Sequence, residues 1–254
     1  MGNNMIGLID CDFVPYICCY NKIGEPEKTL EEAISSANSY LQGLLNGANV
    51  DEFHLYFTIG KNFRYDVYPE YKANRKNNEK PPFFNEVREY LVKEYNGIHG
   101  YYLEADDILN IYKNKYINNK ESYIVISTDK DINNLFGLNY DIKNNVANLV
   151  DQDFADKYFW KSMICGDTAD NIKAIPGKGP AFAEKLFLNI DDVESYRNLV
   201  LNEYITKFGE EIGIDEFYKN YKCLKIKDSY EGMEFTKPIK STEVYARTLG
   251  VARE

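Results

Sequence analysis

The segment MIGLIDCD at residues 5–12 decides the fold class. Its apolar run from Met5 to Ile9 ends directly in Asp10, which is the pattern of a buried β-strand. Residues 53–57 and 123–126 form two more short runs of β-forming side chains, and helical spacing fills the segments between the strands. Strands that alternate with helices build βαβ units. The sequence therefore predicts an α/β fold with a central, mostly parallel sheet and flanking helices.

The helical patterns outside this core suggest two regions. They lie at residues 29–45, 84–95 and 105–116 and, from about residue 153, over most of the remaining chain. Thr29 is expected to cap the first helix. Near the C-terminus, residues 208–222 predict a helix whose neighbourhood packs back on the core through Phe217, Tyr218, Tyr221 and Leu224. We expect an α/β core at residues 1–150 and a helical region at residues 151–254.

Composition limits the classes of protein to consider. A chain of 254 residues with 44% hydrophobic content can bury a full core. No stretch approaches the roughly 20 apolar residues that span a bilayer, and no charged leader precedes an apolar run, so a cytoplasmic protein is expected, in the host cytoplasm if a phage encodes it. The five cysteines form no CxxC pair and are expected to be reduced. The net charge of −10 counts against a global basic field, so any nucleic acid must bind through local basic patches.

Acidic side chains cluster where an α/β sheet places its sites, beyond the carboxyl ends of the strands. They are Asp10, Glu104, Asp106, Asp107, Asp129, Asp131, Asp167 and Asp170. Any one acidic pair alone is usually a helix cap or a solvated face, but four such groups in one α/β pattern are hard to explain that way. Carboxylates packed closely repel one another unless hard cations such as Mg²⁺ or Mn²⁺ bind them. Two such ions about 4 Å apart can stabilise both the attacking and the leaving oxygen of a phosphoryl displacement. For Asp12, a turn or cap role is expected instead.

Five segments resemble one known family in sequence and in order. They are LIDCD at 8–12, NFRYDVYPEYKANR at 62–75, EADD at 104–107, STDKD at 127–131 and GDTADNIKAIPGKGPAFAEKLF at 166–187. They resemble the flap endonuclease and 5′–3′ exonuclease family, which includes the nuclease domain of bacterial DNA polymerase I and small phage enzymes. The resemblance implies a PIN-like or resolvase-like nuclease core at 1–150 that carries most metal ligands. It also implies a helix–three-turn–helix DNA-binding element in the helical region.

The resemblance also implies roles for single residues. Glu104, Asp106, Asp107 and Asp129 match ligands of the tighter metal site with Asp10 beside them, and Asp131, Asp167 and Asp170 match the second site. Lys72 corresponds to the active-site lysine that orients the scissile phosphate, and Arg75 and Arg64 correspond to phosphate contacts. Tyr71 is placed to stack on a base of an unpaired 5′ strand. With 22 tyrosines in the chain, a packing role for Tyr71 is equally expected.

Residues 172–186 resemble the element that grips duplex DNA in relatives, often with a bound potassium ion. Gly177 and Gly179 would let backbone N–H groups point at a phosphate, and Lys178 and Lys185 would add positive charge. A simple Pro-Gly turn between core helices is the alternative, and the upstream GDTADN favours the DNA-binding interpretation.

Two departures from the family pattern matter. Many relatives carry an aspartate in a Phe-Asp-x-x-Gly run, and Thr58 stands at that position here. One expected carboxylate is therefore missing. The segment available for the arch that threads a 5′ strand, from Lys72 to Phe84, is short and contains Pro81 and Pro82. A short or disordered arch is expected.

Together these features predict a monomeric, structure-dependent 5′ nuclease that uses two divalent ions. Its expected substrates are flap, nicked or 5′-ended duplexes of DNA or RNA–DNA hybrids, cut during primer or flap removal in replication. Two alternatives stay open. One is a PIN-like ribonuclease, against which the IPGKGP element argues. The other is a branched-DNA-binding protein with weakened catalysis, which Thr58 favours and the eight other acidic positions oppose.

Overall fold

The central sheet has the predicted, mostly parallel character. The structure is a computed structural model that describes residues 5–21, 27–50, 52–190, 192–229 and 247–248. Its strands are β1 (Ile6–Asp10), β2 (Glu52–Phe57), β3 (Ile98–His99), β4 (Tyr123–Ser127), β5 (Gly137–Asp141), β6 (Val146–Val150) and β7 (Arg247–Thr248). The order is β3-β2-β1-β4-β5-β6, with β7 paired to β2. The pairs among β3, β2, β1, β4 and β5 are parallel, whereas β6 and β7 pair antiparallel. The α/β prediction is confirmed.

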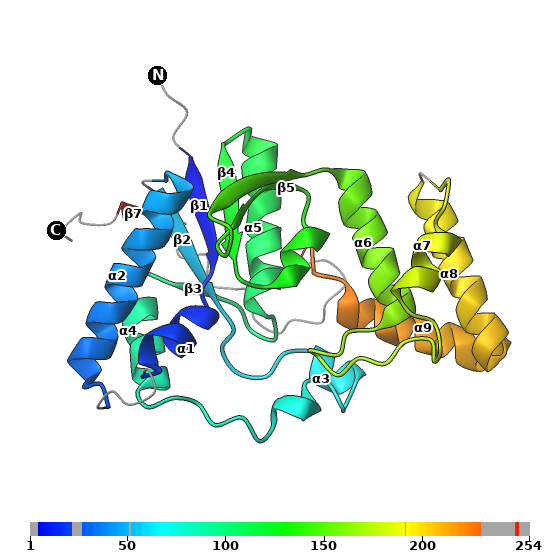
Figure 1. The fold of residues 1–254 in the computed structure, drawn as a ribbon, viewed down its shortest axis with the longest axis horizontal. Helices are drawn as coiled ribbons and strands as arrows, with labels where there is room; N and C mark the ends of the chain where they lie inside the picture. The colour runs from blue at the N-terminus through cyan, green and yellow to red at the C-terminus, as the bar shows by residue number, and fades with distance from the viewer. Residues whose placement is uncertain (1–4, 22–26, 51, 191, 230–246, 249–254) are drawn as a thin grey trace.

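Helices cover both faces of this sheet (Figure 1). They are α1 (Phe13–Cys19), α2 (Leu30–Ala48), α3 (Arg64–Val67), α4 (Phe84–Glu94), α5 (Ala105–Asn119), α6 (Gln152–Cys165), α7 (Pro180–Leu186), α8 (Val193–Phe208) and α9 (Glu210–Leu224), with 3-10 turns η1 (Ala73–Arg75) and η2 (Lys130–Asn134). Thr29 caps α2 as predicted: its hydroxyl accepts the Glu32 N–H, and Glu32 accepts the Thr29 N–H in return.

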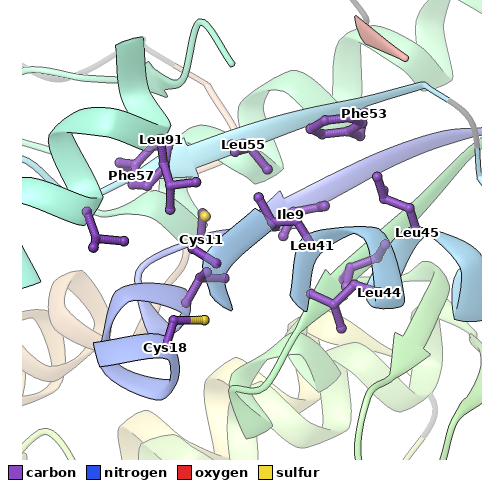
Figure 2. Packing of buried hydrophobic residues seen from close by; sticks show 14 of the residues in the cluster. Ile9, Cys11, Cys18, Leu41, Leu44, Leu45, Phe53, Leu55, Phe57 and Leu91 are labelled. Carbon is purple, nitrogen blue, oxygen red and sulfur yellow. The ribbon is translucent and has the colours of Figure 1, made fainter. Parts of the chain in front are cut away.

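Alternation along the strands builds the two halves of the core. Ile9 of β1 packs with α1, α2 and α4 on one face, and the neighbouring Leu8 packs with α5 on the other. Figure 2 shows Leu41 and Leu45 of α2 close to Ile9. Because the central strands are buried on both faces, their sequences are continuous apolar runs, and these runs made them predictable.

Helices α6 to α9 form a second cluster around Trp160, Phe217 and Tyr204. Phe217 is fully buried, and Tyr221 and Leu224 are partly buried in this cluster, as expected. Tyr218 is 44% exposed, so its predicted packing role is wrong. The boundary near residue 150 stays a prediction. Hydrogen bonds cross it, since the Lys72 N–H donates to the Asp170 carbonyl at 2.9 Å. Within the described ranges, no helix is long and apolar enough to cross a membrane.

One buried titratable group makes the stability of the fold depend on pH. The His54 side chain in β2 is 4% exposed, its Nε2 has no hydrogen-bond partner among the described residues, and burial lowers the pKa of His54 to about 4. The unfolded chain takes up this proton near pH 6.5, before the folded chain does, so stability falls as pH drops from 6.5 through 4. We expect a loss of about 3 kcal/mol from this group.

The measurement is urea unfolding between pH 7 and pH 4 for the wild type and His54→Phe. Phenylalanine keeps a ring against Tyr116 but cannot be protonated. The variant should lose distinctly less stability over this range, and parallel pH profiles for the two proteins would refute the assignment to His54.

Candidate active site

The carboxyl ends of β1 and β4 and the N-terminus of α5 open onto one cavity of about 250 Å³. Its polar walls are Asp10, Asp12, Thr58, Lys72, Arg75, Glu104, Asp106, Ser127, Thr128, Asp129, Asp131 and Asp170. Phe13 and Tyr16 of α1 add an aromatic wall that the sequence did not predict. The expected rule for α/β sheets holds here, because parallel strands end at the same edge and deliver their terminal side chains together.

Ser127 connects the carboxylates of the two central strands. Its hydroxyl donates to Asp10 Oδ2 at 3.1 Å and accepts the Asp129 N–H at 3.0 Å. Asp129 Oδ1 in turn accepts the Asp131 N–H at 2.9 Å, which fixes the turn after β4. The sequence placed Asp10 and Asp129 at strand ends but gave no signal for the role of Ser127.

Asp107 and Arg64 form a buried ion pair. Arg64 Nη1 and Nη2 donate to Asp107 Oδ2 and Oδ1 at 2.6 and 2.8 Å, and the two side chains are 2% and 0% exposed. The other lone pairs of Asp107 accept the Glu104 and Lys227 N–H groups. Asp107 therefore has no oxygen left for a metal, and Arg64 cannot reach a phosphate at the surface. Both expectations are corrected, because a buried guanidinium needs a paired carboxylate.

Tyr71 is also enclosed. It is 1% exposed, and its hydroxyl lies 2.7 Å from Glu104 Oε2 and 2.8 Å from Asp170 Oδ2. A ring in this position cannot stack on a base, so the base-stacking expectation is wrong and the packing alternative holds. Tyr71 joins the N-terminus of α5 to the loop that carries Asp170.

Lys72 and Arg75 lie in the cavity where the resemblance placed them. Lys72 Nζ is 2.5 Å from Glu104 Oε1 and 3.8 Å from Asp170 Oδ2. Burial opposes the charge of Lys72, but Glu104 and Asp170 outweigh it and hold the pKa of Lys72 above its usual range. Arg75 donates to Asp170 Oδ1 at 2.6 Å and is 45% exposed on its side chain. Two cationic side chains thus face the carboxylates of one cavity.

The carboxylates assigned to the second metal site lie close by. Asp131 and Asp170 line the main cavity, and Asp167 lines a smaller hollow that it shares with both. Asp167 is 5% exposed; its Oδ1 accepts the Ala169 N–H at 2.7 Å, and its Oδ2 binds Lys130 Nζ at 2.8 Å. Lys130 stands inside the STDKD motif, but its sequence position did not reveal this contact.

The carboxylates that line the cavity outnumber its cationic side chains, Lys72 and Arg75. Burial, and then the neighbouring Asp12, raise the pKa of Asp10 to about 7, and burial and Asp129 raise the pKa of Asp131 to about 7. Burial, and then Asp107, also raise the pKa of Asp106 well above its usual range. The described residues do not assemble three acidic, histidine or cysteine side chains into a complete cation cage, and basic side chains hold Glu104, Asp167 and Asp170 instead. The donor set is nevertheless the hard-oxygen type that Mg²⁺ and Mn²⁺ prefer.

The turn at 175–180 leads into α7 in the helical region. Gly177 has a φ of +83°, which favours glycine, and no heavy atom lies within 4 Å of where its side chain would start. Gly179 is the N-cap of α7 and is equally open. Lys178 forms an ion pair with Glu203, and Lys185 is exposed. The DNA-binding role of this hairpin stays a prediction.

The expected arch is short. After η1, residues 76–83 lead to α4 without regular helix, and residues 76–80 are exposed. In Figure 1 this stretch runs along the edge of the molecule between α3 and α4.

The comparisons with known proteins agree on one family. The family described as 5′-3′ exonuclease, N-terminal resolvase-like domain, matches residues 8–159. A 5′-3′ exonuclease of Mycoplasmopsis pulmonis is 31% identical over 165 residues, which are 59% of this chain and 54% of that protein. A 5′-3′ exonuclease of Buchnera aphidicola is 28% identical over 200 residues, 71% of this chain and 68% of that protein. The chain thus spans about half the length of the first of these curated relatives.

Among solved structures, the bacteriophage T5 flap endonuclease, determined as a pseudo-enzyme-product complex with DNA and metal ions, has a TM-score of 0.66. The match covers 87% of this chain and 89% of that one at 18% identity, which shows the shared fold. Since the family match spans more than half of the sequence and the fold agrees with it, the chain belongs to the 5′-3′ exonuclease family with the N-terminal resolvase-like domain.

Proposed function

We propose that this protein is a divalent-metal-dependent, structure-dependent 5′ nuclease that acts as a monomer. It hydrolyses phosphodiesters near a 5′ end or flap in DNA or RNA–DNA hybrids and leaves a 5′-phosphate, as primer or flap removal in replication requires. The observation that carries this proposal is the single cavity that unites Lys72 and Arg75 with carboxylates from β1, β4 and α5.

The residues divide into cation ligands and phosphate contacts. Asp10, Glu104, Asp106 and Asp129 would hold one Mg²⁺ or Mn²⁺, and Asp131, Asp167 and Asp170 would hold a second. Cations held there would supply the Lewis acidity that makes water a nucleophile near neutral pH. Lys72 and Arg75 present positive charge to a phosphate in the cavity and stabilise the charge that develops on it. Duplex DNA binds at the turn 175–180, with a potassium ion.

Cleavage of a 5′-labelled flap duplex tests the function directly, with blunt duplex, single-stranded DNA and single-stranded RNA beside it. Cutting near the junction that requires Mg²⁺ or Mn²⁺ is expected. Intact flap binding without cleavage of any substrate would favour the branched-DNA-binding alternative. Preferential cutting of single-stranded RNA would favour the PIN-like ribonuclease.

The hairpin makes its own prediction. Replacing Lys178 and Lys185 by glutamine should weaken duplex binding and flatten its salt dependence by about one unit of log–log slope for each phosphate that is no longer neutralised. Binding is measured by fluorescence anisotropy from 50 to 200 mM salt. Lys115→Gln with Lys120→Gln removes the same charge at the C-terminal end of α5 and should leave the slope unchanged. Equal affinities for the wild type and the hairpin variant would exclude this DNA-binding role.

A further inference from the structure

Asp12 lies in the turn between β1 and α1, which agrees with the turn role among the two expected for it, but its side chain does not cap the helix. It occupies the N-cap position of α1, but it makes no capping hydrogen bond. Its Oδ1 instead accepts the Thr58 N–H at 2.9 Å, which ties the end of β1 to the residue that follows β2. The expected cap role is therefore wrong, and the carboxylate is held in the main cavity.

Thr58 orients this carboxylate through both of its polar groups. The Ala105 N–H at the start of α5 donates to Thr58 Oγ1 at 2.9 Å. The Thr58 hydroxyl, which accepts there, also hydrogen bonds to the Asp12 side chain. A relay of donors thus runs from α5 through Thr58 to Asp12 and fixes the direction in which the carboxylate points.

The charges around Asp12 are mostly negative. Asp10 and Glu104 interact with it repulsively, and the ammonium of Lys72 is the attractive charge nearby. Lys72 itself pairs with Glu104 and Asp170 and forms no ion pair with Asp12. Charge alone therefore does not explain why Asp12 is held here, because a carboxylate in this place repels its neighbours unless a cation lies between them.

The cavity's carboxylates separate into two groups. Among the described residues, Glu104 and Asp170 have basic ion-pair partners. Asp10, Asp12, Asp106, Asp129 and Asp131 line the same cavity without an ion pair to a described basic side chain. Asp12 is thus one of the oxygen donors left to a cation, and it adds a carboxylate beside Thr58, where the sequence lacks one.

We propose that Asp12 is a ligand of the divalent cation held with Asp10 and Asp106, and that Thr58 positions it. The proposal rests on the proposed metal dependence and names a ligand beyond the eight acidic residues assigned from the sequence. Because the side chains of Asp12 and Thr58 touch, an aspartate at either position would place its carboxylate in the same part of the cavity.

Binding of Mn²⁺ to the full chain without DNA, followed by electron paramagnetic resonance and calorimetry, tests this ligand independently of cleavage. Asp12→Asn keeps the size and the oxygen that accepts the Thr58 N–H but removes the charge. It should weaken the tighter Mn²⁺ site about 10-fold to 100-fold. The matched variant Asp153→Asn, an exposed position in the first turn of α6, should bind Mn²⁺ like the wild type.

Moving the carboxylate separates ligation from a structural role. In Asp12→Asn with Thr58→Asp, an aspartate at 58 can still accept the Ala105 N–H and returns a carboxylate to the same place. Mn²⁺ affinity should recover to within about threefold of the wild type, since the number of charged ligands is restored. Thermal unfolding of each variant checks that the fold is intact.

The outcomes distinguish this proposal from the proposed function. Wild-type Mn²⁺ affinity in Asp12→Asn overturns the assignment of Asp12 while leaving the nuclease in place. A loss that Thr58→Asp does not repair also overturns it, because the missing charge is then not the cause. If the wild-type chain itself binds no Mn²⁺, the metal-dependent function fails with it.

Discussion

Replacing Asp129 and Asp131 together by alanine should abolish cleavage of a 5′-flap duplex while binding of that duplex stays measurable. Both side chains line the main cavity, and Asp129 Oδ1 accepts a hydrogen bond from the backbone N–H of Asp131. Each belongs to a different proposed cation site, so the double variant removes a ligand from both. We expect a fall in the single-turnover rate of at least about 10³-fold, which is the scale of losing preorganised charge at a phosphate.

Two comparison variants make this result interpretable. Asp153→Ala with Asp156→Ala removes the same charge from α6, where both residues line a different hollow, and should cleave normally. Asp129→Asn with Asp131→Asn keeps the turn's polar atoms and should be as inactive as the alanine pair. Wild-type cleavage by the alanine variant would show that the active site lies elsewhere.

Breaking the ion pair between Arg64 and Asp107 should lower the stability of the protein strongly. Arg64 also donates to the Cys223 and Lys225 carbonyls, so it joins α3 and α5 to the C-terminal end of α9 and the residue after it. Asp107→Asn takes the bidentate partner from a guanidinium that is 2% exposed and leaves it one longer ion pair, from Nη1 to Glu104 Oε2 at 3.3 Å. We expect a loss of about 3–5 kcal/mol in the free energy of unfolding, as for other broken buried ion pairs. Urea unfolding at pH 7 measures it.

A double variant and an exposed pair serve as controls. Arg64→Met with Asp107→Asn should be no less stable than Asp107→Asn alone, because the stranded charge is gone. Lys61→Met breaks the ion pair between Lys61 and Asp66, whose side chains are 56% and 47% exposed. It should lower the free energy of unfolding by less than about 1 kcal/mol. A cost for Asp107→Asn as small as that of Lys61→Met would contradict the structural role assigned to the buried pair.

The strands that the sequence revealed differ physically from those it did not. β1, β2 and β4 are central and buried on both faces, so each is a run of apolar residues. β3 has two residues, and four of the five side chains of β6 are exposed, so neither carries a clear period. The antiparallel hairpin of β5 and β6 depends on contacts across the sheet that local composition does not encode.

The sequence by itself determined the α/β class, the family motifs and the convergence of Asp10, Glu104, Asp106 and Asp129, because parallel strands and the helices between them end at a common edge. Only the tertiary structure decided how the polar side chains divide between ligation and support. Arg64 and Asp107 are enclosed by residues 223–227, more than 100 positions away, and Asp12 is oriented by Thr58, which follows the neighbouring strand β2. Burial and partner choice depend on which segments meet in space, whereas a motif records only residue type and spacing.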